Sequence, residues 1–157
     1  DAPNLKYRFL GDFDREMLAL IRSVKDFQAL PVQKVWDNDG DQVLAYIRGE
    51  YVFVFNFSPA QSFTDYGLLT PPGTYRTVNT DDPRFGGNGL TDDAIEHLTQ
   101  YDPLYEKEYK GWLKLYLPAR TAMVLKRLPE VRSLSVEQGE IKKRRVRKKR
   151  CHEKGKE

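Results

Sequence analysis

The sequence predicts an all-β fold, namely an antiparallel β-sandwich that follows one helix and precedes a disordered basic tail. The strongest observation is the run 51–57, YVFVFNF, in which six of seven residues are apolar. Further segments rich in β-branched and aromatic residues recur about every ten residues, with Gly, Pro, Asn or Asp between them. Helical periodicity is confined to the start of the chain, and a dense run of positive charge lies at its end.

The composition fits one domain with a core of its own. The chain has 157 residues and a single cysteine, Cys151, so it forms no internal disulfide and we expect a reducing compartment. It has no apolar run long enough to cross a membrane. Because the first residue is Asp1 and not Met, we expect the chain to begin inside a longer polypeptide.

Three segments are expected: 1–33 with a helix, 34–128 with the β-domain, and 129–157 as the tail. In the first segment, Asp12 is a candidate helix N-cap, and Pro31 closes the segment. An apolar face recurs at intervals of three and four residues, on Phe13, Met17, Leu20, Ile21 and Val24. This face needs a partner, either the β-domain or a surface outside this chain.

The strand at 51–57 is the expected centre of the β-domain. Tyr51, Phe53, Phe55 and Phe57 point to one face and Val52 and Val54 to the other, so both faces are apolar and covered. The expected strands are 34–36, 42–48, 51–57, 62–69, 74–80, 111–117 and 121–126. Residues 81–110, rich in Pro, Gly and acidic residues, are expected to form an irregular loop.

Five motifs occur in the order of a known family. They are Leu5–Leu10 with Phe13–Met17, FVFNFSPAQSFTDY at 53–66, PGTY at 72–75, the loop from Asp81-Asp82 to Gly86-Gly87, and YLPART at 116–121. Together they resemble the end of the catalytic barrel and the C-terminal domain of 1,4-α-glucan (glycogen or starch) branching enzymes of the eukaryotic type. The segment 90–110 and everything after Leu128 depart from the family pattern.

This resemblance implies an α-amylase-type C-terminal β-sandwich behind the last helix of a (β/α)₈ barrel. The family transfers α-1,4-glucan segments to 6-hydroxyls, through a nucleophilic and an acid/base carboxylate. Their motifs precede the region covered here, so the chain is expected to be an inactive fragment whose partners are α-glucan and the missing barrel. The resemblance further implies a cytoplasmic location, or a plastid in a plant or alga.

Three aromatic residues are candidate glucan contacts: Trp36, Trp112 and Tyr116. If Leu113, Leu115 and Leu117 face the core, then Trp112 and Tyr116 lie on the other face of the same strand, where flat rings could stack on sugars. The alternative is that Trp112 covers the 81–110 loop or packs against the barrel.

Other polar clusters have ordinary explanations. Asp37, Asp39 and Asp41 alternate as in a calcium loop, but Arg48 occupies the position of the required glutamate, which favours a hairpin turn. Asp81-Asp82 and Asp92-Asp93 are expected to be solvated loop acids, and His97 lacks metal-binding partners. We expect no catalytic residue, cofactor or metal ion in this chain.

The tail carries eight positive charges between Lys142 and Arg150, whereas residues 1–139 have a net charge of −4. Such a run is typical of a solvated tail, a nuclear localisation signal or a weak nucleic-acid arm, and it lacks the aromatic residues that stack on single strands. The alternative function is therefore a stand-alone β-sandwich that binds glucan or, through its tail, nucleic acid or another polyanion.

Overall fold

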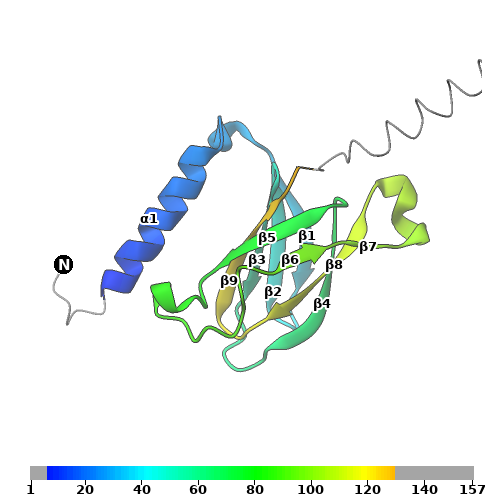
Figure 1. Cartoon of the computed structure of the whole chain (residues 1–157). Helices are drawn as coiled ribbons and strands as arrows, with labels where there is room; N and C mark the ends of the chain where they lie inside the picture. The colour runs from blue at the N-terminus through cyan, green and yellow to red at the C-terminus, as the bar shows by residue number, and fades with distance from the viewer. Residues whose placement is uncertain (1–6, 130–157) are drawn as a thin grey trace, which may run out of the picture.

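The structure of this chain, a computed structural model, describes residues 7–129 (Figure 1). The predicted basic tail from residue 130 onward and residues 1–6 lie outside the described residues. Within 7–129, one long helix is followed by two antiparallel sheets, which confirms the predicted fold class. The elements in chain order are α1 (Tyr7–Ser23), η1 (Phe27–Ala29), β1 (Val32–Asn38), β2 (Val43–Arg48), β3 (Tyr51–Asn56), β4 (Phe63–Thr70), β5 (Thr74–Asn79), η2 (Pro83–Phe85), β6 (Glu96–Leu98), β7 (Gln100–Tyr101), η3 (Pro103–Glu108), β8 (Gly111–Leu117) and β9 (Thr121–Arg127).

The larger sheet has the strand order β1-β2-β3-β9-β5-β6, and the smaller has the order β4-β8-β7. Strand β3 lies between β2 and β9, with Phe53 opposite Tyr46 on one side and Val124 on the other. The prediction that this strand is central is therefore confirmed. The strand ends at Asn56, one residue before the predicted end, and leaves the Phe57 side chain 62% exposed.

The main core lies between the two sheets. Val52 and Val54 point into it from β3, and Leu113, Leu115 and Leu117 point into it from β8. The alternation predicted for both strands is thus confirmed. The remaining buried members of this core are Val43, Ala45, Leu68, Tyr75, Met123 and Leu125.

A second apolar cluster covers the opposite face of the large sheet. Tyr51 and Phe53 of β3 and Val124 of β9 are buried there. The Tyr46 ring stacks on Phe53 with 4.8 Å between centroids, and Phe55 stacks on Phe57 at 5.7 Å. Both faces of β3 are therefore apolar, but this second face is covered by less protein than the first.

Helix α1 covers part of this second face through Met17 and Leu20, and Val24, directly after the helix, extends the contact. The helix begins at Tyr7, so the prediction that Asp12 caps it is wrong. Asp12 lies within the helix and pairs with Arg15 one turn later, at 2.7 Å. No residue of α1 is buried, and among the described residues no helix is long and apolar enough to cross a membrane.

The segment 81–110 is more ordered than the sequence indicated. It contains the short strands β6 and β7 and the short 3₁₀-helices η2 and η3. Strand β6 joins the edge of the large sheet by pairing His97 with Tyr75. Strands of two and three residues are too short to produce a recognisable alternation, which is why the sequence did not predict them.

Candidate functional site

The three candidate glucan contacts lie in three separate side-chain clusters. Trp36 on β1 is half-buried, and its Nε1 donates to the Tyr66 hydroxyl at 2.8 Å. Tyr66 in turn donates to Asp41 Oδ2 at 2.9 Å. Trp36 therefore fastens the edge strand to β4, and only part of its ring remains accessible.

Trp112 on β8 is also half-buried. Its Nε1 donates to Asp102 Oδ2 at 2.9 Å, and Tyr105 packs edge-on against its ring at 5.8 Å. Its other neighbour is Gly67, where a Cβ would lie 3.1 Å from the indole. Trp112 thus covers the 100–110 part of the predicted loop. The sequence offered this packing as one alternative to a sugar contact.

Tyr116 lines a cavity. The pocket has a volume of about 200 Å³ and is bounded by β5, β6, β8, β9 and the segment 90–95. This pocket collects polar and apolar side chains from all of these elements, so it is a concave site beside a predicted contact.

The turn 37–41 is a hairpin turn held by its own side chains. Asn38 Oδ1 accepts from the Asp41 amide at 3.1 Å, and Asn38 Nδ2 donates to Asp41 Oδ2. Asp37 pairs with Lys34 at 2.8 Å. In the described part of the chain, no group of His, Cys, Asp and Glu side chains is arranged to hold a metal ion.

Asp81 is not a solvated loop acid, so that prediction is wrong. The residue is only 3% exposed, and its carboxylate accepts the backbone amides of Asn88 and Leu90. Gly87 lies against the Asp81 backbone so closely that any Cβ there would clash. A carboxylate next to a turn looks hydrophilic in sequence, and only the closed loop around it makes it buried.

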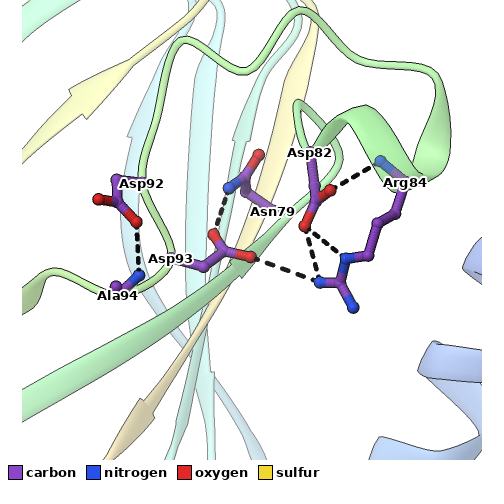
Figure 2. Close-up of polar contacts among 6 residues, drawn as sticks. All are labelled: Asn79, Asp82, Arg84, Asp92, Asp93 and Ala94. Atoms are coloured by element: carbon purple, nitrogen blue, oxygen red, sulfur yellow. Dashed lines mark hydrogen bonds and ion pairs between the residues drawn. The ribbon is translucent and has the colours of Figure 1, made fainter.

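The neighbouring acids are likewise engaged, as Figure 2 shows. Asp82 caps η2 by accepting the Arg84 amide at 2.7 Å, and it pairs with the Arg84 guanidinium, also at 2.7 Å. The hydrogen bond from Arg84 holds the pKa of Asp82 below its usual value. Asp92 accepts the Ala94 amide at 2.8 Å.

Asp93 lies between these groups. Its Oδ1 accepts from Asn79 Nδ2, and its Oδ2 is 3.8 Å from Arg84 Nη2 (Figure 2). Burial raises the pKa of Asp93 above its usual value. Glycoside chemistry needs two carboxylates that face one substrate bond. In residues 79–94 the carboxylates instead hold backbone amides, an amide side chain and an arginine.

The same segment holds the start of α1. Phe85 of η2 packs edge-on against Phe13 at 5.7 Å, and a Cβ on Gly86 would lie 3.1 Å from the Phe9 ring. Further along the helix, a cleft of about 470 Å³ separates α1 from β5 and β9. The helix is therefore attached at both ends and not packed along its length.

The apolar surface of α1 is the feature with the clearest functional implication. Leu10 and Leu18 are 58% and 49% exposed, and Tyr7 is 76% exposed. The carboxylates of residues 79–94 are bonded within the domain, and the apolar surface of α1 is uncovered. These features define a β-sandwich domain that carries a helix with an uncovered apolar surface.

Comparison with known proteins gives the family. The model of the alpha amylase C-terminal all-beta domain matches residues 35–127, more than half of the chain. The chain therefore belongs to this family of domains, and the resemblance seen in the sequence is confirmed.

The relatives named in this comparison are 1,4-alpha-glucan-branching enzymes. The enzyme of Emericella nidulans is 37% identical over 126 residues, which cover 77% of this chain and 18% of the relative. The enzyme of Felis catus is 34% identical over 127 residues, 80% of this chain and 18% of the relative. The chloroplastic/amyloplastic enzyme 2-2 of Arabidopsis thaliana is 39% identical over 127 residues, 79% of this chain and 15% of the relative. The chain thus spans less than a fifth of the length of these relatives.

Proposed function

We propose that this chain acts as the C-terminal part of a 1,4-α-glucan-branching enzyme. In that role, α1 is the last helix of the catalytic barrel and the two sheets form a rear support for it. The observation that carries the proposal is the similarity to branching enzymes over about four fifths of the chain.

The packing of α1 supports this role. The helix uses one face against Tyr51 and Phe53, while Leu10 and Leu18 remain exposed elsewhere on it. Exposed leucines on an amphipathic helix mark a surface that docks against another protein surface. A barrel that shares this helix would cover them, so helix and sandwich would be held to the catalytic domain as one unit.

The chemistry then belongs to the proposed barrel and not to this segment. Branching cleaves an α-1,4 bond and passes the glucan to a 6-hydroxyl, which requires a nucleophile and an acid/base on either side of the bond. The substrate of the whole protein is accordingly α-glucan. Within this chain, Trp36, Trp112 and Tyr116 stay the proposed glucan contacts, each through the accessible part of its ring.

A domain exchange tests the proposal. Residues 5–128 would replace the matching segment of the Emericella nidulans enzyme, and branching would be measured by the fall in iodine staining of amylose. We expect the chimera to branch amylose, because the helix and sheet would restore the support that the barrel requires. The enzyme lacking the segment is the negative control, and the isolated 157-residue chain should show no activity.

A chimera that is folded and soluble yet no more active than the truncated enzyme would contradict the proposed role. Branching by the isolated chain would contradict it in a different way, because the reactive carboxylates would then have to lie in this sequence.

A further inference from the structure

The pocket beside Tyr116 is assembled from both sheets and from the loop that follows Gly89. Its lining includes Thr77 of β5, Met123 of β9, His97 of β6 and Tyr116 of β8. Thr91 and Ile95 contribute from the loop. Its volume of about 200 Å³ corresponds to about seven water molecules. This is enough for a single hexose ring and too little for a longer stretch of chain.

Unpartnered polar atoms gather at this pocket. In residues 7–129, five buried side-chain polar atoms lack a hydrogen-bond partner: Thr70 Oγ1, Thr77 Oγ1, Asn79 Oδ1, Thr91 Oγ1 and Asp93 Oδ2. Thr77 and Thr91 line the pocket, and Asn79 and Asp93 each lie two residues further along the same strand or loop. Buried polar atoms are normally satisfied, so the two unpartnered threonine hydroxyls in the pocket lining indicate hydroxyl-bearing contents.

The charges of the lining residues disfavour anionic ligands. The residues that line the pocket include no Lys or Arg, so no cation is available to bind a phosphate or carboxylate. The Asp92 carboxylate is turned toward the Ala94 amide (Figure 2). Burial lowers the pKa of His97, so its imidazole is neutral at neutral pH. A neutral polar molecule therefore suits this lining better than an anion does.

The walls are not uniformly polar, however. Ile95, Met123 and the Tyr116 ring present apolar surface beside the threonine hydroxyls. A pyranose ring has the matching character, because its C–H faces are apolar and its rim carries hydroxyls that donate and accept hydrogen bonds.

We propose that this pocket binds one hexose unit of a neutral glucan, with Tyr116 against the ring and Thr77 and Thr91 bonded to its hydroxyls. The choice of an α-linked glucan rests on the proposed function, whereas the preference for a neutral hexose follows from the pocket alone. This assigns Tyr116 a specific place among the three aromatic candidates.

Maltose titrated into the full 157-residue chain tests the site. We expect saturable chemical-shift changes in the His97 and Tyr116 ring signals, and weaker changes with glucose 6-phosphate, because the pocket has no cation for its phosphate. Thr77→Val keeps the side-chain shape and removes the hydroxyl, so it should weaken maltose binding by about two- to tenfold. Thr70→Val is the matched control, since Thr70 is equally buried on β4 and does not line the pocket.

Ile95→Ala provides a second variant that does not threaten folding, because Ile95 is 52% exposed at the rim. It too should weaken binding. A pocket that holds only water would give no saturable shift at His97 or Tyr116 at any maltose concentration, and this result would overturn the proposal. Equal weakening by Thr77→Val and Thr70→Val would also overturn it. Neither result affects the domain exchange, which depends on support of the barrel and not on sugar binding here.

Discussion

A single buried carboxylate, that of Asp81, organises the segment between β5 and β6. It accepts the amides of Asn88 and Leu90, and the Asp81 carbonyl accepts the Gly89 amide at 2.8 Å. Asp81→Asn replaces one acceptor oxygen by an NH₂ group that faces an amide donor. We expect a loss of about 1–3 kcal/mol in the free energy of unfolding, measured by urea denaturation.

Asp92→Asn is the control for this prediction. Asp92 makes one comparable bond, to the Ala94 amide, but that bond is exposed to solvent. We expect the control to change stability by less than about 1 kcal/mol. Equal effects of the two substitutions would show that the burial of Asp81 contributes nothing to the fold.

His97 makes stability depend on pH in a defined direction. Burial lowers its pKa below the ordinary value of 6.5, so the unfolded chain takes up a proton at a higher pH than the folded chain does. The contribution of neutral His97 is complete above about pH 6.5 and is lost as the pH falls from there toward the folded pKa. Melting temperatures of the chain and of His97→Gln, followed from about pH 7.5 to pH 5.5, should converge as the pH falls.

Asp93 acts in the opposite direction. Burial raises its pKa above 3.8, so the penalty for its ionised form is relieved as the pH falls. Because Asp93 is present in both proteins, the difference between the chain and His97→Gln isolates the histidine. A pH-independent difference between the chain and His97→Gln would contradict the assignment.

At the scale of the elements, the alternation of side chains along the sequence predicted the strands whose two faces have different surroundings. In β3 and β8 every second residue is a large apolar side chain, and the structure places those residues on one face, as in Leu113, Leu115 and Leu117. The same argument predicted the apolar face of α1 correctly but not its first residue. Asp12 has the chemistry of a cap, yet Tyr7–Gly11 are compatible with helix, and nothing in the local sequence stops it there.

What the sequence could not provide were contacts between distant segments. The pocket beside Tyr116 joins Thr77, Thr91 and Met123, which no local pattern connects. A signal for it existed in Thr77 and Asn79, the two inward polar residues of β5, because a polar side chain on a core face requires a partner. That signal indicates a polar site but does not identify the elements that complete it.

The two sides of β3 should differ in their effect on stability. Leu115 is 1% exposed in the core between the sheets, where Leu115→Ala should cost about 2–5 kcal/mol. Phe55 is only half-buried on the helix side of β3, so Phe55→Ala should cost less than the roughly 3–5 kcal/mol of a fully buried phenylalanine. Urea denaturation of both variants checks this order, and a larger loss for Phe55→Ala would place the dominant core under α1.

For the whole molecule, the two faces of the large sheet differ in how completely they are covered, and this difference determines which surface can dock against another protein. One face is closed by the small sheet, whereas the other is covered in part, by Met17 and Leu20 of α1 and by Val24 and Phe27 after it. The cleft of about 470 Å³ behind the helix leaves α1 as a weakly packed element. A helix in that position adds little to the stability of the domain alone but offers a large apolar surface for docking.

The exposed leucines of α1 therefore predict how the isolated chain behaves in solution. Without a covering surface, Leu10, Leu18 and Ile21 should associate with the same residues of a second copy as concentration rises, because burying them removes apolar surface from water. Leu18→Lys places a charge at the centre of this surface and should shift sedimentation velocity profiles toward the monomer at equal concentration. Gln28→Lys adds the same charge at an exposed position outside α1 and should leave the association unchanged. A chain that stays monomeric at every concentration, with Leu18 protected from labelling, would mean that α1 is already covered and needs no partner.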